Sequence, residues 1–202
     1  MFVQPNEQGR RAVFDDNRTA VEQTHILGSD CLVLVCGAAY DGDLAGARAQ
    51  VRDGIGELAP YARAAGVRLA VEPFHPMMAA SRSVITSVTE ANDLISGLDD
   101  DIIGIAMDAY HLWWDVALPE QITRAGSLIY SVQLADWITP IEGEMSSRGM
   151  PGEGCIDMTD FVQRCRNAGY HGLVEVEVLS DSWWAKPADV AVGAAAAGLA
   201  DL

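Results

Sequence analysis

The sequence predicts an α/β fold in which parallel strands curve into part of a (β/α)₈ barrel. Helical repeats of apolar residues alternate five times with short β-favouring runs. Strands separated by helices need long crossover connections, so they form a parallel sheet. One face of these strands carries small or polar residues and the other carries aliphatic ones. This difference favours a barrel over an open doubly wound sheet, whose two faces are both apolar.

The first half of the chain alternates between helix and strand. In order, the sequence predicts a helix at 12–27, a strand at 31–36, a helix at 44–65, a strand at 68–72, a helix at 87–97 and a strand at 104–108. Gly28 and Gly66 follow the first two helices and are expected to end them. Ser87 with Glu90 has the spacing of a capping box, which predicts the start of the third helix.

The second half continues the same alternation. It predicts a helix at 119–126, a strand at 131–136, a loop at 139–154, a helix at 158–168, a strand at 173–177 and a helix at 187–202. Pro119 suits the first turn of a helix because its missing N–H has no partner there anyway. The long loop is rich in Gly and Met, and a loop of this length is more often functional than idle.

The two faces of the strands follow from counting back in steps of two. The face predicted to point into the barrel carries Ala70, Gly104, Ala106, Ser131 and Glu175. The face predicted to meet the helices carries Leu69, Val71, Ile105, Met107, Val132, Leu134, Val174 and Val176. Arg68 shares the inward face with Glu175, so we hypothesise a buried ion pair between these two residues.

Four of the strands end in a side chain that offers an oxygen ligand. These side chains are Glu72, Asp108, Gln133 and Glu177. A carboxylate at the end of a buried strand is costly unless a cation meets it. The carboxyl ends of barrel strands lie at one mouth, so the sequence predicts a single metal site there. Asp136, just beyond Gln133, suits either this site or a cap for the following turn.

Charge and composition restrict the partners of the chain. The 202 residues include 13 Lys and Arg against 29 Asp and Glu, a formal charge of −16 that disfavours nucleic acid and anionic membranes. A small neutral substrate fits this charge better. The sequence contains no Cys-x-x-Cys pair, no signal-peptide pattern and no apolar run of membrane-spanning length. We therefore expect a cytoplasmic protein with free thiols.

Four motifs in combination resemble a known family. The chain carries Glu-Pro at 72–73, Asp-x-x-His at 108–111, Arg-x-x-Pro-Gly-x-Gly at 148–154 and Gly-x-x-x-x-Glu at 172–177. With these motifs the chain resembles the sugar phosphate isomerase/epimerase family of xylose-isomerase-like TIM barrels. That family includes ketose 3-epimerases, hydroxypyruvate isomerase and inosose dehydratase. The resemblance covers residue 17 to about residue 184.

The resemblance implies a metal site and its ligands. Glu72, Asp108, Gln133 and Glu177 fall on the ligand positions, although many members carry His where this chain has Gln133. An all-oxygen site suits Mn²⁺ or Mg²⁺ better than Zn²⁺, and Co²⁺ is also compatible. Glu72 and Glu177 are implied to be the catalytic acid and base as well as ligands.

The resemblance also implies the substrate-binding residues and a range of reactions. His111, Arg148, His75 and Trp113 are expected to bind a small sugar or polyol substrate. The implied activity is isomerisation or epimerisation of a small ketose or keto-polyol through an enediolate. An inosose-dehydratase-like lyase and a non-catalytic sugar-binding remnant are the alternatives. The zinc-dependent DNA-repair endonucleases of the same barrel fit less well because the charge is −16 and His is scarce.

The number of strands falls short of a full barrel. A (β/α)₈ barrel needs eight strands and about 250 residues, whereas this chain predicts five. We interpret residues 1–202 as a single partial TIM-barrel domain that lacks the first three strands. Either the sequence is a fragment of a longer chain, which we favour, or a shortened form whose open side is covered by another subunit. We expect the chain to form a homo-oligomer.

Overall fold

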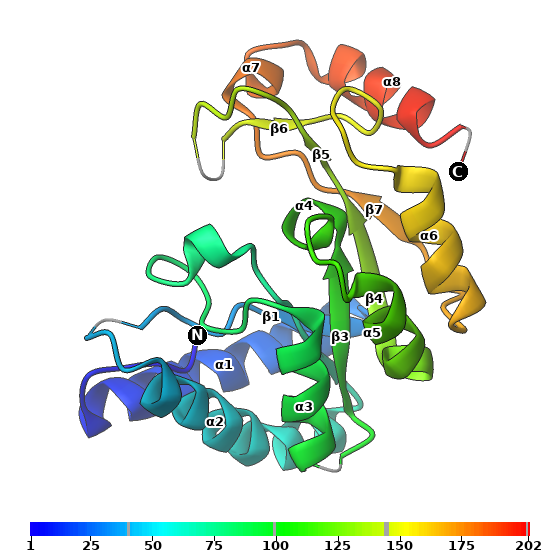
Figure 1. Ribbon diagram of the computed structural model, residues 1–202. Helices are drawn as coiled ribbons and strands as arrows, with labels where there is room; N and C mark the ends of the chain where they lie inside the picture. Colours follow the sequence, from blue (N-terminus) through cyan, green and yellow to red (C-terminus); the bar gives the residue numbers. More distant parts are fainter. Residues whose placement is uncertain (40, 99, 144–145, 201) are drawn as a thin grey trace.

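The computed structural model contains a half-barrel of five parallel strands (Figure 1) and describes residues 1–39, 41–98, 100–143, 146–200 and 202. The strands are β1 (Cys31–Leu34), β2 (Arg68–Val71), β3 (Ile103–Asp108), β4 (Ile129–Leu134) and β7 (Val174–Val176). They lie in the spatial order β1-β2-β3-β4-β7, and each neighbouring pair is parallel. The predicted partial barrel and its five strands are therefore confirmed.

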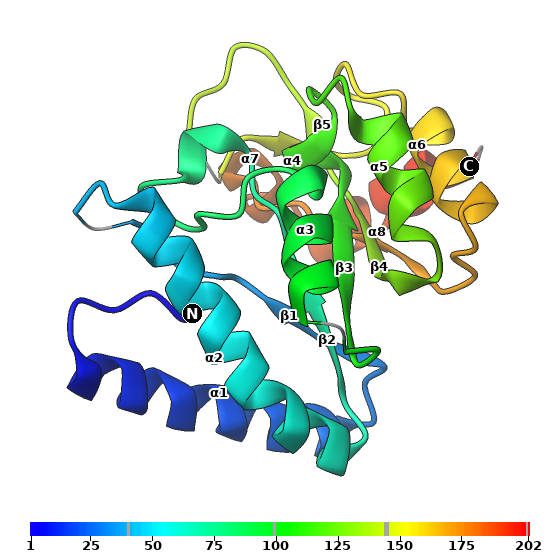
Figure 2. The same ribbon diagram turned by 60° about the horizontal axis from the view of Figure 1, so that its bottom comes forward.

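Helices cover the outer face of the strands. They are α1 (Glu7–Leu27), α2 (Leu44–Ala65), α3 (Val88–Leu98), α5 (Leu118–Ala125) and α6 (Met158–Asn167). Figure 2 shows α1 running alongside α2 at one side of the half-barrel. The first helix begins at Glu7, earlier than the predicted residue 12, because the side chain of Asn6 caps it by accepting from Gly9 N. Gly28 and Gly66 end α1 and α2 in left-handed conformation, as expected.

Short elements gather at the carboxyl ends of the strands, and most were not expected from the sequence (Figure 1). They are η1 (Pro76–Met78), α4 (Ala109–Leu112), β5 (Asp136–Trp137), β6 (Arg148–Gly149) and α7 (Asp181–Trp184), while η2 (Gly126–Leu128) precedes β4. The predicted last helix is present as α8 (Ala188–Gly198), and Leu199 directly after it packs against the core. Strands β5 and β6 pair antiparallel and form a small separate sheet. Strand β6 lies within the predicted long loop at 139–154, of which residues 144 and 145 lie outside the described part of the chain.

The predicted division between the two strand faces is confirmed. The core between strands and helices contains Leu69, Val71, Ile105, Met107, Val132 and Leu134. Ala70 and Ala106 form a smaller cluster with Tyr130 on the other face. Tyr130 reaches that face because the register of β3 against β4 shifts between Ile105 and Ala106. A Cβ on Gly104 would lie 2.5 Å from the Tyr130 ring, so this glycine makes room for it.

The hypothesised ion pair between Arg68 and Glu175 is wrong. Arg68 donates from Nε to the Asp30 carbonyl at 3.2 Å, and its guanidinium carbon lies 4.5 Å from the centre of the Tyr130 ring. Glu175 lies beside Gln133 in the register and is exposed. The Glu175 carboxylate instead accepts from Gln133 Nε2 at 3.3 Å.

All four cysteines are free thiols, as predicted. Among the described residues, no helix combines the length and the apolar character that crossing a membrane requires. Two of the thiols are deeply buried: burial raises the pKa of Cys36 and that of Cys165 to about 12. These two side chains act as part of the apolar core.

Candidate metal centre

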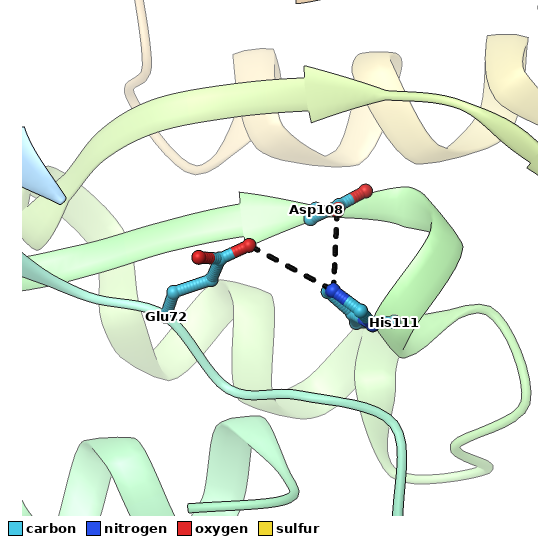
Figure 3. Close-up of side chains that lie close together, drawn as sticks. All are labelled: Glu72, Asp108 and His111. Carbon is cyan, nitrogen blue, oxygen red and sulfur yellow. Dashed lines mark ion pairs between the residues drawn. The ribbon is translucent and has the colours of Figure 1, made fainter. Parts of the chain in front are cut away.

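Two acidic side chains and a histidine converge at the carboxyl ends of β2 and β3. Glu72 follows β2 directly, and Asp108 is the last residue of β3. Asp108 also caps α4, because its Oδ1 accepts from Tyr110 N at 2.9 Å. The cap turns the chain so that His111 of α4 points back toward both carboxyl groups, as Figure 3 shows. All three side chains are buried.

The distances within this group suit a shared ion. His111 Nε2 lies 3.6 Å from Asp108 Oδ2 and 3.9 Å from Glu72 Oε1. One ligand atom from each of the three residues lies within 4.8 Å of the others. The His111 ring is held by stacking on Phe74, with ring centres 4.2 Å apart. This buried Glu, Asp and His group could hold a metal ion.

Arg148 connects this group to Glu177. Its Nη1 donates to Asp108 Oδ2 at 2.9 Å and to Glu177 Oε2 at 3.0 Å, while Nη2 lies 3.1 Å from His111 Nε2. The guanidinium also lies over the Tyr110 ring. Arg148 is only 1% exposed, whereas the Glu177 side chain is 43% exposed. The structure thus brings three predicted site residues, Asp108, His111 and Glu177, around the guanidinium of a fourth, Arg148.

Gln133 lies next to Asp108 in the sheet. The register pairs Asp108 with Gln133 and Gln133 with Glu175. Its side-chain Nε2 donates to Glu175 Oε2 at 3.3 Å, which leaves Oε1 as the free ligand atom. This buried oxygen has no hydrogen-bond partner among the described residues.

Burial dominates the electrostatics of the centre. It raises the pKa of Glu72 well above the usual value, and the charges of Asp108 and Glu177 raise it further. Burial also raises the pKa of Asp108 and Glu177, although Arg148 opposes both shifts. The pKa of His111 falls to about 2, first through burial and then through Arg148, so the ring is neutral. Burial alone would lower the pKa of Arg148, but Asp108, Glu177 and Glu72 raise it.

The chemistry of these groups fits a divalent cation. Burial favours the protonated form of these carboxyl groups, and a bound cation would favour their ionised form instead. The buried Oε1 of Gln133 and the buried Nδ1 of His111 have no partners among the described residues. A buried amide oxygen without a partner is uncommon unless an ion or a water molecule satisfies it. The residues present therefore fit a metal site.

Aromatic side chains form a rim beside the centre. His75 and Trp113, both predicted to contact substrate, each lie against Trp137, with ring centres 4.9 and 5.5 Å apart. Trp137 also lies 4.9 Å from the buried Tyr110 ring, and Trp114 lies against His75. Burial lowers the pKa of His75. The sequence analysis did not single out Trp137. Its position just beyond the carboxyl end of β4, where barrel side chains face the mouth, was the available signal.

The position of Asp136 decides between its two predicted roles. Its fully buried carboxylate accepts four main-chain N–H bonds from Trp137, Gly152, Gly154 and Ile156. It caps the turn and does not contact the acidic group. The glycine-rich loop is therefore tied to the end of the Gln133 strand.

These features define part of a (β/α) barrel with an acidic centre at the carboxyl ends of its strands. Residues 1–201 match the family described as xylose isomerase-like TIM barrel, and the chain belongs to this family. The predicted resemblance is thereby confirmed. Relatives and solved structures of similar fold include isomerases, epimerases and dehydratases of sugar-like substrates.

Two curated relatives illustrate this range. A 3-dehydroshikimate dehydratase of Pseudomonas aeruginosa is 31% identical over 166 residues, which are 80% of this chain and 25% of the dehydratase. The chain thus spans about a quarter of the length of that relative. An inosose isomerase of Bacillus licheniformis is 23% identical over 188 residues, which are 91% of this chain and 66% of the isomerase.

Solved structures share the fold over nearly the whole chain. A protein from Sinorhizobium meliloti 1021 is 41% identical with a TM-score of 0.96, over 99% of this chain and 74% of that protein. The IOLI protein, solved with a bound zinc atom, is 22% identical with a TM-score of 0.84, over 100% of this chain and 72% of that protein. The second similarity concerns the fold alone.

Proposed function

We propose that the chain carries the active centre of a divalent-metal-dependent isomerase or epimerase. The substrate is a small ketose or keto-polyol, and the reaction passes through an enediolate. The metal ligands are Glu72, Asp108, Gln133 and Glu177, the residues that end or follow four neighbouring strands. His111 contributes a nitrogen donor beside Glu72 and Asp108.

This proposal rests on a shortage of positive charge at the centre. Glu72, Asp108 and Glu177 form the acidic group. Among the described residues, the basic side chain that pairs with this group is Arg148. If all three carboxyl groups ionise, one guanidinium leaves two negative charges uncompensated, which is costly in a buried site. A divalent cation supplies the two missing positive charges.

The donor atoms favour Mn²⁺. Carboxylate and amide oxygens suit Mg²⁺ and Mn²⁺, whereas the imidazole of His111 suits Mn²⁺, Co²⁺ and Zn²⁺ better than Mg²⁺. The zinc atom in the IOLI structure is consistent with a centre that accepts transition metals. When bound, the ion polarises a substrate carbonyl and stabilises the negative charge that develops on its oxygen.

The residues of the chain move and hold protons around the substrate. Glu72 and Glu177 act as the acid and base pair, because burial raises the pKa of both toward the range where proton transfer is efficient. Neutral His111 orients a substrate oxygen, and the guanidinium of Arg148 offers donors to another. His75 and Trp113 contact the carbon skeleton from the rim.

A lyase is the second candidate, and the similarity to a 3-dehydroshikimate dehydratase favours it. Dehydration begins with the same proton abstraction next to a carbonyl. It then requires loss of a β-hydroxyl group, which a protonated carboxyl such as Glu72 can assist. The two candidates therefore differ in the second step and share the centre.

The proposal is tested first by metal binding. Mn²⁺ is titrated calorimetrically into chelator-treated protein that circular dichroism shows to be folded. We expect one site per chain, and we expect Glu177→Gln to weaken binding at least about 100-fold because it removes an anionic ligand. Glu57→Gln, which removes the same charge from an exposed position on α2, is the control and should leave the affinity unchanged. Folded wild type that binds no Mn²⁺ would refute the proposed centre.

The reaction type is tested by exchange in D₂O with a panel of ketoses, inososes and dehydroshikimate. Isomerisation or epimerisation incorporates deuterium at the carbon beside the carbonyl, which NMR detects. Dehydration removes a hydroxyl group and introduces a new carbon–carbon double bond, which changes the ultraviolet spectrum. Metal binding with neither signal across the panel would favour the sugar-binding remnant over an enzyme.

A further inference from the structure

Asp136 is buried at the junction between the Gln133 strand and the loop that carries Arg148. Its Oδ1 accepts from Trp137 N at 2.8 Å and Ile156 N at 3.0 Å. Its Oδ2 accepts from Gly152 N at 2.9 Å and Gly154 N at 2.8 Å. Four main-chain donors thus satisfy a carboxylate that is shielded from solvent.

The glycine pattern of the loop is explained by this contact. Gly152 has a φ of +94°, which a residue with a side chain rarely adopts. A Cβ on Gly154 would lie 2.6 Å from Asp136 Oδ1 and 2.3 Å from the Trp137 carbonyl. The two glycines therefore let the backbone approach and enclose the carboxylate.

The same junction holds the backbone of Arg148. Strands β5 and β6 pair Asp136 with Gly149 and Trp137 with Arg148. On the other side, Arg148 N donates to the Leu179 carbonyl at 3.2 Å. The guanidinium of Arg148 reaches Asp108 and Glu177 from this position. Asp136 thus fixes the end of the loop that faces the centre without contacting the acidic group itself.

We propose that Asp136 is a positioning residue that sets the guanidinium of Arg148 between Asp108 and Glu177. The inference rests on the proposed function, in which Arg148 binds a substrate oxygen. Loss of the carboxylate releases the turn at 152–156, and the Arg148 side chain then leaves its fixed position. Asp136 acts on the centre only through this loop.

The test follows the guanidinium directly by NMR. The Arg148 side-chain N–H signals are assigned by their absence in Arg148→Lys. In metal-free wild type we expect separate, slowly exchanging Nη signals, because Nη1 and Nη2 have different buried partners. In Asp136→Asn, whose amide nitrogen cannot accept hydrogen bonds, we expect these signals to merge toward the shifts of an exposed arginine.

A second variant and a control make the result specific. Gly154→Ala keeps every charge but forces the carboxylate and the loop apart, so it should merge the same signals. Asp157→Ala removes the side chain that caps α6 nearby, so it should leave the Arg148 signals unchanged despite a loss of stability. Unchanged Arg148 signals in either folded variant, Asp136→Asn or Gly154→Ala, would overturn the inference. Mn²⁺ titration of wild type is independent of these spectra, so failure of the proposed function would be seen separately.

Discussion

At the scale of single residues, Arg148 is held in an unusually polar buried environment. It contacts a fully buried carboxylate, a half-buried one and a neutral imidazole. A guanidinium in such a position compensates charges that would otherwise lack a partner, so its removal is expected to cost more than the loss of one contact.

We predict that Arg148→Met lowers the free energy of unfolding of the metal-free protein by about 3 kcal/mol, because Asp108 then lies buried without a cation. Urea titration at neutral pH measures this change. Arg68→Met is the matched control, since within the described part of the chain Arg68 bonds a main-chain carbonyl and stacks on Tyr130 but meets no carboxylate. The control should cost less than about 1 kcal/mol. Equal losses in the two variants would contradict the importance of the buried pair.

The lowered pKa of His111 predicts that the free energy of unfolding depends on pH. Its pKa is about 2 in the folded protein, below the ordinary value of 6.5. The unfolded chain therefore binds a proton at His111 that the folded chain does not, so this contribution to stability is present above pH 6.5 and declines as the pH falls.

The comparison with His111→Asn isolates this effect. The difference in unfolding free energy between wild type and variant should shrink below pH 6.5 by up to about 1.4 kcal/mol per pH unit. Chemical denaturation between pH 5 and pH 8 in the presence of chelator measures it. A difference that stays constant over this range would show that His111 has the same pKa in the folded and unfolded states, which would contradict the prediction.

Strand-end side chains were predictable from the sequence, but loop geometry was not. Glu72, Asp108 and Gln133 follow from the alternation along the strands, because each strand end must lie at the common mouth. The roles of Asp136 and Trp137 depend on a turn that returns from residues 148–156, and no local pattern fixes such a contact. Arg148 was expected at the site from its motif, while its bridging of two carboxyl groups became visible only in three dimensions.

At the scale of elements, the close approach of β3 to β4 depends on a glycine. We predict that Gly104→Ala destabilises the protein by about 1–3 kcal/mol, because its Cβ would meet the Leu128 carbonyl and the Tyr130 ring. Gly193→Ala on exposed α8 meets nothing within 4 Å and should be neutral or stabilising by up to about 1 kcal/mol. Thermal unfolding of both variants checks the prediction, and a stable Gly104→Ala protein would argue against this packing.

At this scale, the face on which a side chain lies was predictable, whereas the side chains that it contacts on that face were not. Alternation correctly separates Leu69 and Val71 from Ala70. It carries no information on how far neighbouring strands are displaced along their axes. The ion pair expected between Arg68 and Glu175 is wrong because a shared face does not fix which side chains meet: Arg68 bonds the Asp30 carbonyl, and Glu175 accepts from Gln133.

At the scale of the whole molecule, the half-barrel has two free edges. Within the described part of the chain, β1 and β7 each pair with a neighbour on one side only. Unpaired strand edges are sites of association unless charges or other segments cover them.

We therefore expect the isolated chain to form concentration-dependent dimers or larger assemblies, which sedimentation velocity detects. Val33→Lys places a charge on β1 and should shift the distribution toward the monomer. Val190→Lys on exposed α8 is the control and should leave the distribution unchanged. A wild type that sediments as a monomer at all concentrations would contradict this expectation.

The order of the strands has a consequence for how the protein can diversify. Strands β2, β3, β4 and β7 are consecutive neighbours, so the whole acidic group belongs to one uninterrupted sheet. The residues proposed to transfer protons therefore come from adjacent strands, and their spacing depends on the hydrogen bonding between those strands. Changes in the loops beyond the strand ends can alter the shape of the accepted molecule without altering this spacing. Such a division of labour allows one chemical step to serve isomerases, epimerases and dehydratases alike.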